Sequence, residues 1–319
     1  MSTEIPDCLQ SLKHFLAIQD LSAEALQALI DFSIRRKGQF KRGELKPVLE
    51  RKVLAMLFQK SSLRTRLGFE TAMVQLGGYA VCLEDHQIGV AKREEPKDIA
   101  RVMSSMCDGI MARVKAHQIL IELAARSTVP VINGLSDWSH PCQALADVMT
   151  LQEHFGSVAG RKLAFIGDGN NVARSLLSAS AKLGMSFALA APKKYQFDDG
   201  VIQSAHDKAG KNGAAIVQTE QPEEAAADAD VLYTDVWTSM GQESERAARE
   251  ADFAGYQINA ALVKKAKPKA VVMHCLPAYR GLEITDEVID GSQSLVFQQA
   301  ENRLHSQRAL LEVLLGRRK

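Results

Sequence analysis

The sequence predicts an α/β protein made of two doubly wound parallel-sheet domains, with the active site in the cleft between them. Its 319 residues exceed the length at which a single hydrophobic core usually stops growing. Short apolar runs alternate with longer segments of helical period, as in sheets whose parallel strands are joined by crossover helices. Polar residues follow most of the apolar runs, and ligands of such sheets bind at the carboxyl ends of the strands.

Nine apolar runs are expected to be strands, four in the first half of the chain and five in the second. They are Val53–Phe58, Tyr79–Leu83, Gly109–Ala112, Val129–Ile132, Leu163–Ile166, Phe187–Ala190, Ala215–Val217, Val231–Tyr233 and Ala270–Met273. The helical periods predict helices at Thr65–Leu76, Cys142–Phe155, Val172–Leu183 and Glu301–Leu315. Gly77 and Gly184 follow two of these helices, where glycine is the typical left-handed stop.

The domain boundary is expected within or just after the helix Cys142–Phe155, because Gly156 and Gly160 then interrupt the chain before a new strand. We place the first domain at 1–148 and the second at 149–289, with a C-terminal helix at 290–319 that packs back on the first domain.

A polar stretch, Trp237–Tyr256, has two interpretations. It is either a lid or a solvated helix with Glu245–Arg249 and Arg246–Glu250 pairs.

The composition excludes several classes of protein. With 46% hydrophobic and 24% charged residues, the chain has the apolar content that disordered proteins lack. The 39 Lys and Arg residues nearly balance 38 Asp and Glu, so a nucleic acid or membrane partner is not expected and any anion site must be local. Five cysteines without a CxxC pair favour a reducing cytoplasm, and no secretion signal or membrane-spanning run is evident.

The segment Ser62–Arg66 follows the first predicted strand at the start of a helix. Free backbone N–H groups, the helix dipole and guanidinium donors would together suit a phosphate dianion. The alternative is an ordinary serine cap with solvated arginines. Arg113, at the end of another strand, favours the anion site, because a buried cation is costly unless an anion neutralises it.

The segment Gly167–Asn171 resembles a dinucleotide-binding fingerprint only weakly, since Val172 occupies the position of the third glycine. Its two asparagines offer amide donors and acceptors to a polar ligand. The alternative is that an asparagine simply caps the following helix.

His274 and Cys275 are adjacent, which invites comparison with a Cys–His nucleophile. Neighbouring residues of a strand point to opposite faces, so we do not expect covalent catalysis. The eight histidines show no metal-ligand spacing with each other or with the cysteines, and we expect neither a metal nor another cofactor.

Four motifs in one order make the chain resemble the ornithine carbamoyltransferase family, within the aspartate/ornithine carbamoyltransferase superfamily. The motifs are Ser62-Leu63-Arg64-Thr65-Arg66, His140-Pro141-Cys142-Gln143-Ala144-Leu145-Ala146-Asp147, Asp235-Val236-Trp237-Thr238-Ser239-Met240-Gly241 and His274-Cys275-Leu276-Pro277. The similarity runs from about Leu9 to Leu315 and includes Gln299–Arg303.

The resemblance implies a carbamoyltransferase that joins the carbamoyl group of carbamoyl phosphate to the δ-amine of L-ornithine, giving L-citrulline and phosphate. Direct amine attack without a covalent intermediate and a place in arginine biosynthesis in the cytoplasm are implied too, with the biosynthetic and catabolic directions both open. A homotrimer with shared active sites is implied by Gln87, which lies where the family donates a residue to the neighbouring subunit. A related amine such as N-acetylornithine or putrescine, or a non-catalytic binding role, remains an alternative.

The resemblance also implies residue roles. The carbamoyl phosphate site would consist of Ser62, Leu63, Arg64, Thr65, Gln87, Arg113, His140, Gln143 and Arg303. Ornithine would bind to Asn171, Asp235, Ser239, Met240, Cys275 and Leu276. The residues implied in catalysis are Arg113, His140, Asp235, Cys275 and Arg303. We expect Arg64, Arg66, Arg113 and Arg303 to gather at one phosphate-bearing substrate. Leu63 replaces the family's usual threonine, which removes one hydroxyl donor but leaves the backbone N–H.

Overall fold

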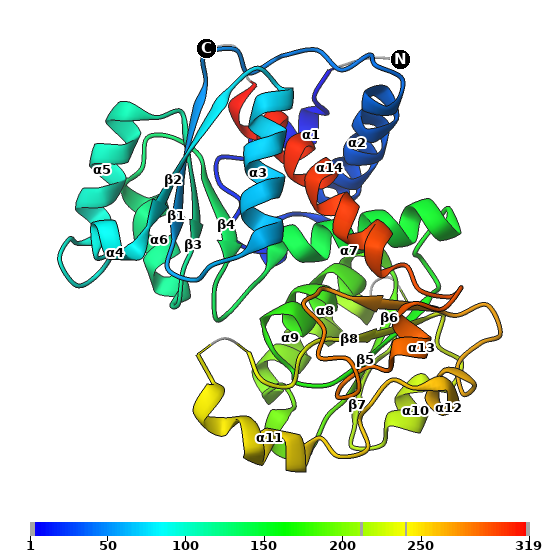
Figure 1. The fold of residues 1–319 in the computed structure, drawn as a ribbon. Helices are drawn as coiled ribbons and strands as arrows, with labels where there is room; N and C mark the ends of the chain where they lie inside the picture. Colours follow the sequence, from blue (N-terminus) through cyan, green and yellow to red (C-terminus); the bar gives the residue numbers. More distant parts are fainter. Residues whose placement is uncertain (1–3, 211–212, 240, 317–319) are drawn as a thin grey trace. The chain divides into compact units, whose positions relative to one another are not determined.

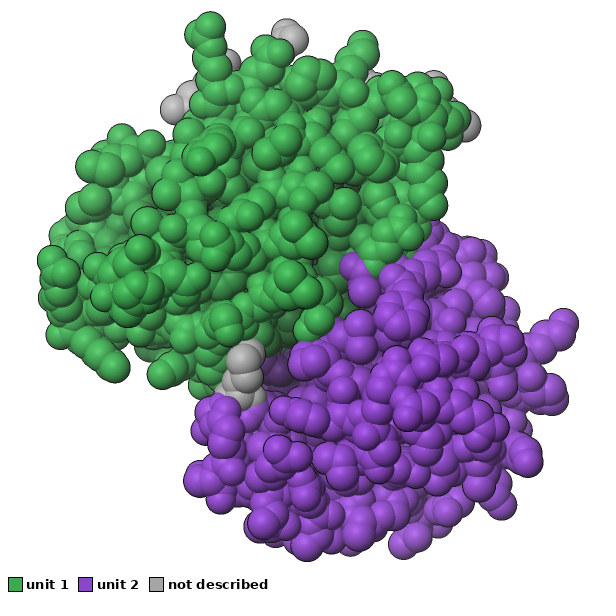
Figure 2. All heavy atoms as spheres, in the orientation of Figure 1, with its two compact units in different colours: residues 1–149, 301–319 green, residues 150–300 purple. Residues whose placement is uncertain are grey.

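The computed structural model describes residues 4–210, 213–239 and 241–316, which form two compact units (Figure 2). Unit 1 contains residues 1–149 and 301–319, and unit 2 contains residues 150–300. Residues 290–300 were expected to return to the first domain, but they belong to unit 2. The last helix begins at Val296, which is before the predicted Glu301 but after the expected boundary at residue 290. The preceding segment is tied to a strand of unit 2, because Val272 N donates to Gln293 O at 2.8 Å and Leu295 N to Val272 O at 2.9 Å.

The sheet of unit 1 has four strands in the order β2-β1-β3-β4, all parallel (Figure 1). The strands are β1 (Val53–Phe58), β2 (Tyr79–Glu84), β3 (Gly109–Arg113) and β4 (Val131–Leu135). All four predicted strands are therefore confirmed. Only β4 begins later than the predicted Val129, after Pro130, which has no N–H to donate to a ladder.

Helices cover both faces of this sheet (Figure 1). Those of unit 1 are α1 (Asp7–Gln10), α2 (Ala23–Lys41), α3 (Leu63–Gln75), α4 (Asp85–Ile88), α5 (Pro96–Met106) and α6 (His117–Arg126), with a 3-10 turn η1 (Ile18–Asp20). Alternate strand residues such as Ala55 and Leu57 pack with α5 and α6 in one apolar cluster. At the start of β3, Gly109 lies so close to α14 (Val296–Leu315) that an added Cβ would be 3.2 Å from Leu315.

The sheet of unit 2 has five parallel strands in the order β7-β6-β5-β8-β9. They are β5 (Lys162–Ile166), β6 (Ser186–Ala190), β7 (Ile216–Thr219), β8 (Val231–Thr234) and β9 (Val271–His274). Each matches a predicted strand to within two residues. The helices are α8 (Asn171–Leu183), α9 (Asp199–Ala209), α10 (Pro222–Ala226), α11 (Arg246–Asp252), α12 (Ala260–Val263) and α13 (Asp286–Ile289), with 3-10 turns η2 (Lys193–Tyr195) and η4 (Glu243–Glu245). The helix α7 (Pro141–Phe155) carries the chain out of unit 1, and α14 returns it.

Each sheet has one point at which the strand order reverses. In unit 1 the chain leaves β1 towards β2 on one side and later adds β3 on the other, and in unit 2 the same happens at β5 and β8. Ligands of open parallel sheets bind at the carboxyl ends of the two strands that flank this switch point. The fold therefore directs attention to the residues after β1 and β3 in unit 1, and to those after β5 and β8 in unit 2.

Within the described part of the chain, no helix combines the length and the apolarity needed to cross a membrane. None of the five cysteines forms a disulfide.

Candidate active site

The residues after β1 form the N-terminus of α3. Ser62 caps this helix, because its Oγ accepts a hydrogen bond from Thr65 N at 3.3 Å and lies 3.1 Å from Thr65 Oγ1. The first backbone N–H groups of a helix have no partner within it and lie at the positive end of the dipole. The side chain of Leu63 is 74% exposed. Its replacement of threonine therefore alters the outer surface of this turn and leaves the buried side of the turn unchanged.

A buried hydrogen-bonded chain joins three helices of unit 1 next to this cap. Arg303 on α14 donates to Thr65 Oγ1 at 3.2 Å and to Gln143 Oε1 at 2.6 Å. Gln143 on α7 in turn donates to Asp147 Oδ1 at 2.8 Å. All four side chains are at most 2% exposed. The fold thus brings together Thr65, Gln143 and Arg303 from three distant parts of the sequence, and Asp147 orients the amide of Gln143.

Positive charge is concentrated beside these hydrogen-bonded side chains. Arg113 ends β3 and His140 directly precedes α7, and both side chains are 6% exposed. Burial lowers the pKa of His140 well below its ordinary value, and the positive charges of Arg303, Arg113 and Arg64 lower it further. The imidazole is therefore neutral at pH 7 and surrounded by guanidinium groups. Such an arrangement favours an anionic ligand, since like charges out of water are costly without a counter-charge.

Gln87 lies outside this buried group of residues. It lies on α4, where its side chain is exposed and its Oε1 accepts a hydrogen bond from Glu84 N at 2.9 Å. This segment borders a cavity of about 490 Å³ at the carboxyl ends of β1 and β2. The residues lining the cavity are Phe58, Gln59, Ser61, Glu84, Asp85, His86, Gly89 and Lys92.

In unit 2, the loop after β5 positions two amides. Asn170 caps α8, with its Oδ1 accepting from Val172 N and Ala173 N, as the capping interpretation predicted. Its Nδ2 also donates to Asp235 Oδ2 at 2.8 Å, so the same residue orients a carboxylate. Asn171 is the first residue of α8.

Gly169 in this loop is required for packing. Its N–H donates to Tyr195 O at 2.8 Å, and a Cβ would lie 2.8 Å from the same oxygen. A close approach to the backbone of unit 2 therefore explains this glycine without a dinucleotide.

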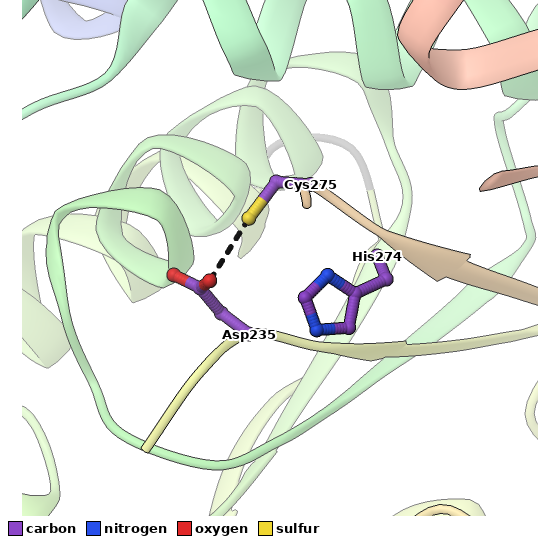
Figure 3. Close-up of side chains that lie close together, drawn as sticks. All are labelled: Asp235, His274 and Cys275. Carbon is purple, nitrogen blue, oxygen red and sulfur yellow. Dashed lines mark hydrogen bonds between the residues drawn. The ribbon is translucent and has the colours of Figure 1, made fainter. Parts of the chain in front are cut away.

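The residues after β8 and β9 meet at Asp235 (Figure 3). Cys275 Sγ donates to Asp235 Oδ1 at 3.0 Å, and Val236 N donates to the same oxygen at 2.8 Å. The imidazole of His274 accepts from Leu276 N at Nδ1, at 2.9 Å, and Nε2 lies 3.1 Å from Glu283 Oε1. Because Nδ1 accepts an N–H, the proton of the ring is on Nε2. The imidazole therefore cannot accept the proton of the Cys275 thiol at Nδ1, which argues against a Cys–His nucleophile.

Among the residues that the structure describes, Asp235, His274 and Cys275 form a group that could hold a metal ion. Ligand atoms of Asp235, His274 and Cys275 lie within 4.8 Å of one another, although the sequence spacing did not indicate a cluster. Both imidazole nitrogens are engaged by Leu276 and Glu283, as described above. The donor set available without breaking those bonds is one thiol and one carboxylate, which is fewer than the three protein ligands of a catalytic zinc site.

The polar stretch after Trp237 is anchored by Arg249. Ser239 N donates to Gln242 Oε1 at 3.0 Å, and Gly241 follows with a φ of 94°. Met240, an expected ornithine ligand, lies outside the described residues. The expected pairs Glu245–Arg249 and Arg246–Glu250 are both present, at 2.9 and 2.7 Å. The solvated interpretation is nevertheless wrong for Arg249, which is only 6% exposed.

Arg249 is buried because it links three segments of unit 2. Its NH1 donates to Asp168 Oδ2 at 2.7 Å and to Trp237 O at 3.0 Å, and its guanidinium lies 4.7 Å from the centre of the Tyr195 ring. Sequence reasoning missed Glu283, the contact of Asn170 with Asp235 and the burial of Arg249. Local signals indicated only that Asn170 could cap a helix and that Arg249 could pair with Glu245.

Known proteins match this chain along nearly its whole length. The family profile described as "Aspartate/ornithine carbamoyltransferase, carbamoyl-P binding domain" matches residues 13–153, and the profile "Aspartate/ornithine carbamoyltransferase, Asp/Orn binding domain" matches residues 159–314. The ornithine carbamoyltransferase of Anoxybacillus flavithermus is 50% identical over 303 residues, which cover 95% of this chain and 96% of that protein.

Solved structures of similar proteins share the fold. The ornithine carbamoyltransferase from Pyrococcus furiosus has a TM-score of 0.93 and 48% identity, covering 96% of this chain and 98% of that one. The anabolic ornithine carbamoyltransferase from Campylobacter jejuni has a TM-score of 0.88 and 38% identity, covering 95% and 99%. Sequence, fold and the residues at both switch points therefore agree: the chain belongs to the aspartate/ornithine carbamoyltransferase family, whose members transfer carbamoyl groups.

Proposed function

We propose that this protein is an ornithine carbamoyltransferase, which transfers the carbamoyl group of carbamoyl phosphate to the δ-amine of L-ornithine and releases L-citrulline and phosphate. The observation that carries the proposal is the buried Thr65–Arg303–Gln143 chain beside the capped N-terminus of α3. It provides fixed donors and positive charge at the switch point of a sheet, as a phosphate-bearing substrate requires. The named relatives support the same activity.

Unit 1 is the carbamoyl phosphate domain in this proposal. The phosphate accepts hydrogen bonds from the first turn of α3, from the hydroxyl of Ser62 and from the guanidinium of Arg64. Leu63, whose side chain is exposed, contributes only its backbone N–H. The replacement of threonine by Leu63 is therefore no argument for a non-catalytic role, because it leaves the buried residues of the site unchanged.

The carbamoyl oxygen gains negative charge as the amine attacks the planar carbon. Arg113 and the neutral imidazole of His140 donate to this oxygen, and Arg303, held by Gln143 and Thr65, adds positive charge. Donors fixed before the reaction stabilise developing charge more than mobile water does. The new N–C bond forms while the C–O bond to phosphate breaks, and the departing phosphate takes the proton that the amine loses.

Unit 2 is the ornithine domain. The δ-amine resembles that of lysine, with a reference pKa of about 10.4, so it is mostly protonated at pH 7 and must lose a proton before it attacks. The carboxylate of Asp235 already accepts from Cys275, Val236 and Asn170. These donors spread its charge, so it can orient the amine without holding it firmly as a cation. Asn171, Ser239, Met240 and Leu276 complete the ornithine contacts.

We further propose a homotrimer in which Gln87 of one subunit serves the site of the next. Exposed apolar side chains lie along α3 and the neighbouring edge strand β2, and a patch of this kind marks an interface. They are Leu63, Leu67, Val74, Tyr79 and Val81. Light scattering tests this proposal: a trimer is expected for the native chain, with dissociation and loss of activity in Leu67→Glu. A monomeric native chain with full activity would rule the trimer out.

The enzyme acts in the cytoplasm in this proposal, consistent with five cysteines that form no disulfide, and belongs to arginine biosynthesis. The decisive experiment incubates purified protein with carbamoyl phosphate and, separately, ornithine, N-acetylornithine, putrescine or aspartate. Citrulline is expected with ornithine, and little ureido product with the others. If no amine is carbamoylated, the proposed activity is wrong, and preference for another amine would move the assignment to that substrate.

A further inference from the structure

Glu283 is a buried carboxylate with no role in the reaction described above. Its residue is 1% exposed, and it lies in the segment before α13. One oxygen, Oε1, accepts from Nε2 of His274 at 3.1 Å and from the backbone N–H of Tyr279 at 2.6 Å. These two donors lie on either side of the turn that contains Cys275 and Leu276. A single carboxylate oxygen therefore holds both ends of this turn.

His274 makes further hydrogen bonds that hold the turn. Its Nδ1 accepts the N–H of Leu276 at 2.9 Å, and its own backbone N–H donates to Gln299 Oε1 at 3.0 Å. The bond from Nε2 to Glu283 keeps the proton on Nε2, which leaves Nδ1 free to act as an acceptor. Loss of the carboxylate would therefore weaken the bond to Leu276 as well.

The turn needs such support. Leu276 has a φ of 56°, a left-handed conformation that residues with a side chain rarely adopt, and one that the surroundings must stabilise. Directly before it, the Cys275 thiol donates to Asp235 at 3.0 Å (Figure 3). The orientation of Asp235 and the exposure of Cys275 thus depend on the conformation of the turn.

We propose that Glu283 and His274 are positioning residues that hold the Cys275–Leu276 turn against Asp235 and so determine the affinity for ornithine, without touching either substrate. The inference rests on the proposed function, because it concerns the ornithine contacts of that reaction. Both residues belong to unit 2, so their effect is specific to the amine substrate.

The first test compares Glu283→Ala with Glu283→Gln, and uses Glu287→Gln as a matched control. Glutamine retains an oxygen that accepts from His274 and Tyr279, whereas alanine retains none. Glu287 is exposed and lies four residues further along the chain. We expect the KM for ornithine to rise roughly tenfold or more in Glu283→Ala, with the KM for carbamoyl phosphate within about twofold. Glu283→Gln should recover most of the affinity, and Glu287→Gln should match the native enzyme.

A second readout does not depend on turnover. Alkylation of Cys275 by iodoacetamide, followed by mass spectrometry of its peptide, reports the position of the turn, because this residue is only 8% exposed. Cys107 in unit 1 is the internal reference. We expect Cys275 to react faster in Glu283→Ala and at the native rate in Glu283→Gln. If native protein forms no ureido product, the proposed function fails, while the labelling rates still test the role of Glu283.

His274→Asn covers the case in which Glu283→Ala does not fold. Asparagine can place an acceptor near the position of Nδ1 but cannot reach Glu283, so the same rise in the KM for ornithine and in Cys275 labelling is expected. The proposal is overturned if the folded variants keep the native KM for ornithine and labelling rate. It is equally overturned if both KM values rise together, which would indicate a general loss of structure.

Discussion

At the scale of single residues, Arg64 and Arg66 are close in sequence but differ in their surroundings. Arg66 is exposed and forms two ion pairs. Its Nε lies 3.0 Å from Glu70 Oε1, and its Nη1 lies 3.6 Å from Glu84 Oε1, so its charge is already paired. These ion pairs give no support to the expectation that it gathers with the other arginines. The charge of Arg64, in contrast, contributes to the lowered pKa of His140, which identifies it as part of the buried cationic group.

Arg64→Ala should weaken carbamoyl phosphate binding by about 10- to 100-fold, because a charge-assisted hydrogen bond is worth about 1.5–3 kcal/mol. Arg66→Ala, with an exposed ion pair at stake, should change the Kd by less than about threefold. Isothermal titration with carbamoyl phosphate measures both. Equal losses in the two variants would contradict the placement of the phosphate at the buried side of α3.

The thiol of Cys275 allows a second prediction at the scale of single residues. Its contact with Asp235 is a hydrogen bond that a hydroxyl can replace, so Cys275→Ser should keep at least about a tenth of the native kcat. Steady-state assays with saturating ornithine test this expectation. Complete inactivity of a folded serine variant would restore the nucleophile hypothesis.

At the scale of elements, α11 illustrates a short helix that depends on tertiary contacts, and the contact of Arg249 is the one that lies buried. A helix of seven residues is not stable alone in water. Arg249 connects it to Asp168 in the loop after β5 and to Trp237 O, just before Ser239. The polar stretch is thus fixed at its helical end, next to residues proposed to bind ornithine.

Arg249→Met should lower the free energy of unfolding by about 2–3 kcal/mol, because it leaves Asp168 without its buried partner. It should also raise the KM for ornithine, since one of the loops that the arginine connects leads into Asn171 at the start of α8 and the other carries Ser239. Arg246→Met is the matched control on the same helix. It loses an exposed i,i+4 pair, worth about 0.3–0.5 kcal/mol, and a cation–π contact with the exposed ring of Tyr279. Thermal unfolding and steady-state kinetics measure both effects, and similar values for the two variants would contradict the anchoring role.

At the scale of the whole molecule, buried and half-buried histidines couple stability to pH. Four of them have pKa values lowered chiefly by burial: His14, His117, His140 and His305. In the unfolded chain they take up protons near pH 6.5, whereas in the folded chain they do so only at lower pH. Between the lowered pKa values of the folded chain and pH 6.5, the unfolded state therefore binds more protons than the folded state. The stability of the folded state falls as the pH falls below about 6.5.

The melting temperature should accordingly decrease between pH 7.5 and 5.5. His14→Asn should reduce this dependence, because asparagine can still accept the N–H of Val131 but does not titrate. His206→Asn, at an exposed helical position, should leave the dependence unchanged. Calorimetry at several pH values provides the test, and a melting temperature that rises towards pH 5.5 would contradict the role assigned to buried histidines.

The sequence by itself determined the α/β class, all nine strands and the polar residues at their ends. These depend on local periodicity, and hydrophobic burial leaves that signal in any stretch of chain. The motifs also identified Thr65, Gln143 and Arg303 through their resemblance to a family. Local signals could not show that the segment from Asp290 would lie beside β9, because its partner Val272 is far away in the sequence.

Only the tertiary structure decided which polar side chains share their hydrogen bonds. It separated Arg64 from Arg66, made Asn170 a partner of Asp235 and buried Arg249 against Asp168. It also brought Glu283 to both ends of the Cys275–Leu276 turn. A polar residue carries no periodic signal, and whether it is solvated or buried depends on which partner the fold places within about 3 Å.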